Sequence, residues 1–279
     1  MAEPVTGYPR WQGTLSGGTR AWTIVATEFR KVWDDTWGRT AIFLVLAYTA
    51  LYMGQRFTLG QTGTESSVHT MDAYVAFLDL IRWGALAVVA VAAGPSLLED
   101  RRKGALELYF SRSVTRADYL VGKLGAVFLL ALFVMFVPAL VYYGSSFMFF
   151  DTKPDGWNTA LLGALGYSVG WAALVSGLGL GLSTTMRSSR GASLVLFGGF
   201  AALDIILAEL LHGITRRATF QILSPFNAVS RQTEWIFGIE PEGELNFPAW
   251  WGLVEWVLLT VVGWALVAWR YPKVAGEGR

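Results

Sequence analysis

Cysteine is absent from this chain of 279 residues, and histidine occurs only twice. Without cysteine, the chain has no disulfide, no thiolate metal ligand and no cysteine nucleophile. His69 and His212 form neither an HExxH zinc motif nor a histidine cluster. These absences argue against zinc chemistry and cysteine catalysis, but they say nothing about the redox compartment.

Charge is also scarce. Charged residues make up 15% of the chain and hydrophobic residues 53%, which leaves too few ionisable groups to coat a soluble globule of this size. The net charge is +1, and the basic residues lie in short clusters between apolar runs, so nothing favours nucleic acid as a partner. The missing surface solvent is therefore expected to be a lipid bilayer.

The apolar residues form long runs. Residues 41–53, 84–98 and 124–143 are apolar on every face, unlike the alternating pattern of a transmembrane strand. At about 20 residues per crossing, the runs predict an all-α integral membrane protein with six transmembrane helices within residues 37–270. The six spans are expected over residues 37–57, 78–98, 119–144, 157–182, 192–211 and 250–269.

The segment before the first span has a different pattern. Residues 20–36 place apolar residues, including tryptophans, on one helical side and charged residues on the other. This pattern predicts an amphipathic helix in the headgroup layer. Residues 1–19 lack the basic start and apolar core of a signal peptide, so we expect a flexible cytoplasmic tail.

Basic residues predict the orientation. The amino-terminal segment, the 99–118 loop, the connection with Arg187 and Arg190, and the 271–279 tail together hold roughly sixteen Lys and Arg, against about five on the other side. We therefore expect both termini to be cytoplasmic.

Three local signals refine the spans. Thr115 and Asp118 have capping-box spacing directly before an apolar run, so the third span should begin there. Gly94 and Pro95 predict a kink near the end of the second span. Gly166 and Gly170 form a GxxxG pair, which predicts close helix packing by the fourth span.

The 99–118 loop is more than a solvated connector. Leu106, Tyr109 and Phe110 form an apolar patch at helical spacing inside a charged segment. An exposed patch of this kind favours a binding partner. A loop folded back on the bilayer is the alternative.

The sequence of this loop resembles the loop between the second and third spans of type 2 ATP-binding-cassette (ABC) permeases. The likeness lies in an acidic pair, basic residues, Gly-Ala-Leu-Glu-Leu at 104–108, Ser-Arg-Ser-Val-Thr-Arg at 111–116, and Gly-Lys at 122–123 opening a helix. It extends to Glu28 in the amphipathic helix, to residues 181–188 at the end of the fourth span, and to the six-span layout. Ser113 stands where members of the family often have proline.

The resemblance implies that a short coupling helix in this loop docks in a groove of a cytoplasmic ATPase, braced by the amino-terminal helix. The apolar patch would supply buried contact, and the charges around it would fix orientation. The residues implied in coupling are Glu28, Glu99, Asp100, Arg101, Gly104, Leu106, Glu107, Tyr109, Phe110 and Arg116.

The chain carries no P-loop of its own. Around Gly122 and Lys123, Ala117 stands at the first glycine position and Leu124 replaces the hydroxyl residue. ATP and magnesium are therefore expected on a partner, and no cofactor on this chain. The resemblance implies an exporter with two ATPase copies beneath two permease subunits, as a homodimer or heterodimer, in the plasma membrane of a prokaryote. The substrate is left open.

Ionisable residues at membrane depth are functional candidates. Asp79 and Arg82, three residues apart on one helix, can neutralise each other. Asp204 lies deepest and can line a substrate path or find a partner across the bundle or the dimer seam. The candidate residues for the substrate path are Asp204, Glu209, Asp79, Arg82 and Glu255.

The segment 212–249 is long for a connector and contains apolar stretches between prolines. It predicts either a re-entrant segment in the outer leaflet, which the resemblance supports as an outer gate, or a folded extracellular cap.

Two other functional classes stay open. A secondary transporter or channel is the main alternative, although the halves show no inverted repeat in hydropathy. An intramembrane serine enzyme is the other. Ser193 and His212 would lie about 28 Å apart on one helix at about 1.5 Å per residue, so they cannot meet, but Ser168 in the fourth span could still approach His212 through space.

Overall fold

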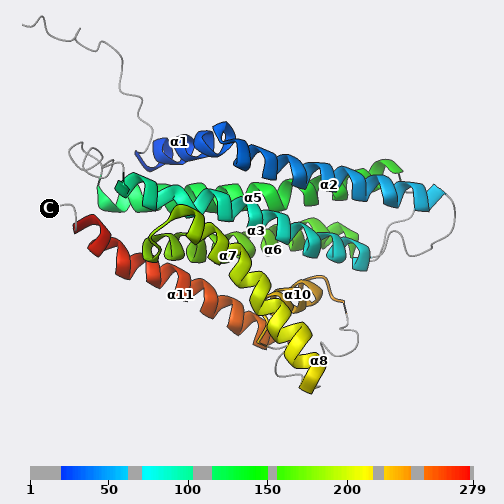
Figure 1. The fold of residues 1–279 in the computed structure, drawn as a ribbon. Helices are drawn as coiled ribbons and strands as arrows, with labels where there is room; N and C mark the ends of the chain where they lie inside the picture. The colour runs from blue at the N-terminus through cyan, green and yellow to red at the C-terminus, as the bar shows by residue number, and fades with distance from the viewer. Residues whose placement is uncertain are drawn as a thin grey trace, which may run out of the picture.

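The computed structural model describes residues 20–61, 71–102, 115–149, 156–215, 223–239 and 248–276. These parts of the chain are helical and contain no strand, which confirms the all-α prediction. Long helices lie along one another, and α7 and α11 splay from the others (Figure 1). In chain order the elements are α1 (Arg20–Asp34), α2 (Thr36–Gln61), α3 (Met71–Arg102), α5 (Arg116–Phe149), α6 (Trp157–Thr185), α7 (Ser189–Asp204), the π-helix η1 (Ile205–Leu211), α8 (His212–Thr215), α10 (Pro225–Ile236) and α11 (Ala249–Gly276).

Five segments are long and apolar enough to cross a membrane. They correspond to the predicted second to sixth spans. The α2 helix has 26 residues but is not among them, because polar residues such as Gln55 and Arg56 dilute its second half. Six spans therefore stay a prediction. The five segments are Met71–Asp100, Arg116–Phe147, Trp157–Thr185, Ser189–Leu207 and Trp250–Arg270.

The helix ends refine the predicted boundaries. The α3 helix continues through Pro95 to Arg102, and α5 begins at Arg116, so the connection is shorter than the predicted 99–118 loop. The α11 helix extends to Gly276, which places the first part of the predicted 271–279 tail inside a helix. Residues 1–19 lie outside the described residues.

The predicted capping box is confirmed. The Thr115 backbone N–H and hydroxyl donate to Asp118 Oδ2 at 3.2 and 2.7 Å, and the Asp118 N–H donates back to Thr115 Oγ1 at 3.1 Å. The two residues satisfy each other's donors at the start of a helix. The third predicted span therefore begins where the spacing indicated.

The α3 and α6 helices form the interior of the bundle. Tyr74, Phe77 and Leu78 on α3, and Tyr167 and Trp171 on α6, are completely buried. The outer helices α2, α7 and α11 instead expose many large apolar side chains. These side chains are not buried inside the protomer. In a membrane protein, apolar side chains that point outward face lipid or another subunit.

Glycines let α6 and α11 approach closely, but not through the predicted GxxxG pair. Gly166 faces open space, whereas Gly170 and Gly177 face the indoles of Trp256 and Trp264. The Trp256 Nε1–H donates to the Gly170 carbonyl at 3.3 Å. Of the predicted pair, only Gly170 therefore lies at the contact with α11. The next glycine at this contact is Gly177, seven residues further along α6.

The predicted amphipathic helix is α1, which lies alongside the start of α5 (Figure 1). Ile24 and Val25 are buried against the bundle, while Trp22 and Trp33 are exposed. The amino-terminal helix is thus packed onto the bundle along one face. Its position in the headgroup layer stays a prediction.

Candidate functional site

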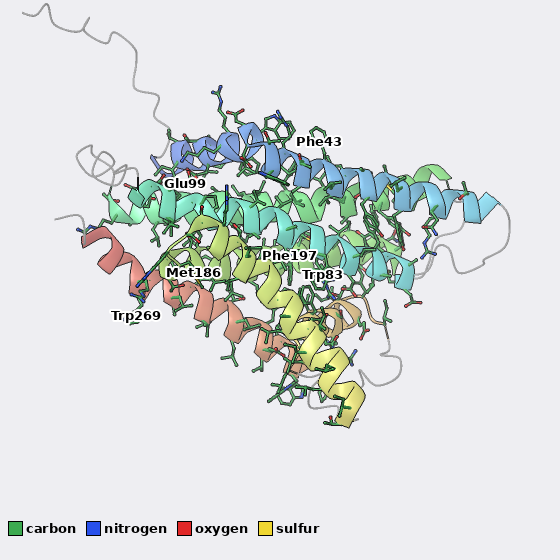
Figure 2. All side chains as sticks on the ribbon, viewed as in Figure 1. Phe43, Trp83, Glu99, Met186, Phe197 and Trp269 are labelled. Atoms are coloured by element: carbon green, nitrogen blue, oxygen red, sulfur yellow. The ribbon has the colours of Figure 1, made fainter. Side chains whose placement is uncertain are left out.

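The two ends of the predicted coupling loop lie at one end of the bundle, together with the start of α1 and the end of α11 (Figure 1). Figure 2 places Glu99 at this end, with Met186 and Trp269. The predicted coupling residues Gly104, Leu106, Glu107, Tyr109 and Phe110, and the side chain of Arg101, lie outside the described residues.

A closed ring of four alternating charges joins three helices at this end. Lys123 of α5 places its Nζ 2.9 Å from Glu28 Oε1 of α1 and 2.6 Å from Asp100 Oδ2 of α3. Lys31 of α1 pairs with the same Glu28 oxygen and lies 3.7 Å from Asp100 Oδ1. We call Glu28, Lys31, Asp100 and Lys123 the charge ring.

Further hydrogen bonds satisfy the ring. The Tyr119 hydroxyl donates to Asp100 Oδ2 at 2.8 Å, and Lys123 Nζ donates to the Ser96 carbonyl at 2.9 Å. The Ser96 hydroxyl is 3.4 Å from Glu28 Oε2. Buried charges are stable only when they are paired and their remaining donors and acceptors are used, and this ring meets both conditions.

Helical spacing explains how so few residues build the ring. Ser96 and Asp100 are four residues apart on α3, Tyr119 and Lys123 four apart on α5, and Glu28 and Lys31 three apart on α1. Residues at these spacings lie on one face of a helix. Each helix therefore presents two polar groups to the same point.

The sequence reasoning missed Lys123 as a functional residue. It is 1% exposed, although a lysine near a span end is ordinarily expected to extend its ammonium to water. The available signal was its position one turn after Tyr119 in an apolar helix. Of the other predicted coupling residues, Glu28 and Asp100 are buried in the ring, Glu99 is half-buried and Arg116 is exposed.

The predicted Asp79–Arg82 ion pair is formed, and it belongs to a larger contact. Arg82 Nη1 lies 2.9 Å from Asp79 Oδ1. The same nitrogen donates to the Phe226 carbonyl at 3.2 Å and to the Ser230 hydroxyl at 2.8 Å. Phe226 and Ser230 belong to α10, so this arginine holds α10 against α3.

Asp204 contacts the N-terminus of α10. Its Oδ1 accepts a hydrogen bond from the Ser224 hydroxyl, and Ser224 is the N-cap of α10, whose Oγ accepts from the Asn227 N–H. Asp204 ends α7 directly before the π-helix. Asp204 was predicted either to line a substrate path or to find a partner across the bundle or the dimer seam. The structure shows a partner within the bundle, Ser224.

Aromatic side chains complete the seat of α10. The Phe226 ring stacks on Trp83 at 3.9 Å between centroids, and the Arg82 guanidinium lies 4.8 Å from the Phe226 centroid. Trp171 and Phe200 lie 5.9 and 5.8 Å from the same ring. Figure 2 shows Trp83 in this region, beside Phe197 of α7. Phe226 is thus the anchor of α10.

The remaining candidate acids are less connected. Glu255 is half-buried near the start of α11, and the Glu209 side chain lies outside the described residues. On α10, Glu234 lies 3.3 Å from Arg231; burial raises the pKa of Glu234, and Arg231 acts in the opposite direction. No group of three or more acidic or histidine side chains placed to hold a metal ion occurs among the described residues.

These features define a multi-pass, all-helical membrane protein with polar anchoring sites for a short helix near each end. The family model described as ABC-2 family transporter protein matches residues 22–274, nearly the whole chain. The chain therefore belongs to this family, whose members are the transmembrane permease components of ABC transporters and usually work with a cytoplasmic ATPase. No curated protein sequence matches the chain.

Proposed function

We propose that this chain is the membrane-spanning permease subunit of an ABC exporter, driven by a separate cytoplasmic ATPase. The observation that carries the proposal is the family match from α1 to α11. The charge ring supports it, because three helices are joined where the candidate coupling loop leaves and re-enters the bundle. ATP and magnesium belong to the partner, and this chain is not itself the enzyme.

Coupling is proposed to run through residues 103–114. The loop leaves α3 at Arg102 and returns to α5 at Arg116. Leu106, Tyr109 and Phe110 supply the apolar patch that docks on the ATPase. A displacement of the docked patch acts on α3 and α5 together, because Lys123 of α5 binds Asp100 of α3.

In this proposal α1 braces the loop from the side. One face packs on α5 through Ile24 and Val25, and a flank with Trp22 and Trp33 is exposed. The Arg30–Asp34 pair is also exposed. Aromatic residues suit the headgroup layer and ion pairs suit water, which supports the proposed position of α1 at the membrane boundary beside the ATPase.

At the other end, α10 is proposed as the outer gate. It is held by Arg82 at one point and by Asp204, through Ser224, at another. Its packing against the sides of α3, α6, α7 and α11 favours a re-entrant helix over an extracellular cap. Substrate passing this gate would meet Asp79, Arg82, Asp204 and Glu255.

The complete transporter is proposed to contain two such permease subunits, identical or related, and two ATPase subunits. Both termini face the cytoplasm, and the complex lies in a prokaryotic plasma membrane. The excess of basic residues on the charge-ring side supports this orientation.

The proposal is tested by purifying the tagged chain from its native membrane in mild detergent, with mass spectrometry and an ATPase assay. We expect a P-loop ATPase to copurify and to be lost from a Leu106→Glu/Tyr109→Glu variant. The matched control is Trp235→Glu, which also adds a charge to an exposed apolar position, but on α10. If no ATPase copurifies in several mild detergents, a secondary transporter or channel becomes the better reading.

A further inference from the structure

The starting observation is that the most buried cation of the charge ring serves three helices at once. Lys123 is 1% exposed, and its ammonium group contacts one carboxylate from α1 and one from α3. Because Lys123 belongs to α5, separating α1 or α3 from α5 there removes one of the two carboxylate partners of a buried ammonium group. Such a separation is strongly unfavourable.

The ring lies directly at the ends of the coupling loop. Asp100 is two residues before the end of α3, and Tyr119, which donates to Asp100, is three residues after the start of α5. Both loop ends are therefore fixed within about one helical turn. Glu28 adds α1 to the same point.

Close backbone packing fixes the position of α1 along α5. A Cβ atom on Gly122 would lie 2.7 Å from Ile24 Cβ and 3.0 Å from the Ala21 carbonyl oxygen. One turn further, a Cβ on Gly125 would lie 3.4 Å from Val25 Cγ2. The charge contact and the glycine contacts thus hold α1 in one register.

The two lysines of the ring are not equivalent. The Lys31 side chain is 50% exposed and reaches Asp100 only at 3.7 Å, so water screens its charge. Lys123 is enclosed and reaches both carboxylates at under 3 Å. The two residues therefore carry the same ammonium group, one exposed and one buried.

From these contacts we infer that Lys123 is a positioning residue for ATPase coupling. It joins α1 and both ends of the 103–114 segment into one rigid unit, so that movement of the ATPase reaches the bundle without being absorbed by the loop ends. This inference rests on the proposed function. It assigns the role to a residue outside the proposed docking patch.

The test compares Lys123→Met with Lys31→Met, which remove the same charge from the same ring. Each is combined with Val25→Cys/Gly125→Cys in the otherwise cysteine-free chain. A sulfur at position 25 can occupy the place of the Val25 methyl next to position 125. The rate of disulfide formation, followed by maleimide labelling of the remaining thiols, reports how firmly α1 is seated. ATPase turnover per assembled complex is measured in parallel.

For Lys123→Met we expect cross-linking and ATPase turnover per assembled complex each to fall about tenfold, because two carboxylates lose their buried partner. The KM for ATP should stay unchanged, since the nucleotide site lies on the partner. For Lys31→Met both losses should stay below about twofold. A purely structural role would lower the yield of complex and leave turnover per complex unchanged, and that result overturns the inference.

A milder variant tests the inference even if Lys123→Met does not fold. Glu28→Gln releases only the α1 contact and leaves Lys123 with Asp100 and the Ser96 carbonyl, so we expect at least about threefold slower cross-linking. Wild-type rates in this variant contradict the rigid unit. Failure of any ATPase to copurify with the wild type would instead refute the proposed function, and the cross-linking comparison would still report on the seating of α1.

Discussion

The two ends of the bundle solve the same packing problem in different ways. Each has a short amphipathic helix, α1 or α10, attached by a buried cation from a long helix, Lys123 or Arg82. Lys123 binds two carboxylates, whereas Arg82 binds one carboxylate, a carbonyl and a hydroxyl. The attachment of Lys123 to α1 is therefore ionic, in addition to the apolar packing of Ile24 and Val25.

Neutral contacts dominate at the α10 end. Arg82 contacts α10 at the Phe226 carbonyl, the Ser230 hydroxyl and the Phe226 ring, which is itself buried among aromatic side chains. When a neutral hydrogen bond breaks, water can take the place of the lost partner. A buried carboxylate that loses its ammonium partner finds no replacement of similar strength. The comparison indicates that detaching α1 costs more free energy than detaching α10, which agrees with the proposed gate role of α10.

The largest expected effect tests this difference directly. Lys123→Met should lower the free energy of unfolding in detergent by about 3–5 kcal/mol. The reason is that the exposed Lys31 is then the one cation of the charge ring left to pair with Glu28 and Asp100. Arg82→Met should cost less, about 2–3 kcal/mol, since the Asp79 side chain it abandons is 26% exposed and partly solvated. Thermal unfolding of the two purified variants measures the order, and equal losses would break the comparison.

Much of the local structure follows from residue spacing alone. The Thr115–Asp118 capping box and the Asp79–Arg82 pair involve residues within one helical turn, so the helix itself brings the partners together. The long helices follow from apolar runs in the same way. Expectations of this kind need no knowledge of which helices are neighbours.

The parts that were missed depend on which helices are neighbours. Lys123 finds its carboxylates on two other helices, and Phe226 finds its aromatic seat on three. The GxxxG pair was only half right, because a sequence pattern does not say which side of a helix faces its neighbour. Gly166 and Gly170 are separated by about 40° around the helix axis at 3.6 residues per turn, and only Gly170 faces α11.

A second prediction sharpens the comparison through two glycines. Gly122→Ala should destabilise the protein by about 1–3 kcal/mol, because the new methyl group meets Ile24 and the Ala21 carbonyl where α1 packs most closely. Gly166→Ala should stabilise it by about 0.5–1 kcal/mol, because that position faces open space within a helix. Denaturation in detergent measures both changes, and a loss of stability in Gly166→Ala would show that this face is covered by another element.

The last prediction concerns the cap of α10. Ser224→Ala removes both the N-cap acceptor for Asn227 and the donor to Asp204, so it should cost about 1–2 kcal/mol. Its matched control is Ser188→Ala, which removes an exposed cap of α7 that bonds only to the Gly191 N–H, and should cost about 0.5–1 kcal/mol. Hydrogen exchange should rise in α10 for Ser224→Ala and leave the α1 amides unchanged. Faster exchange in α1 as well would mean that the two attachments open together, and the separate roles assigned to the two ends would then fail.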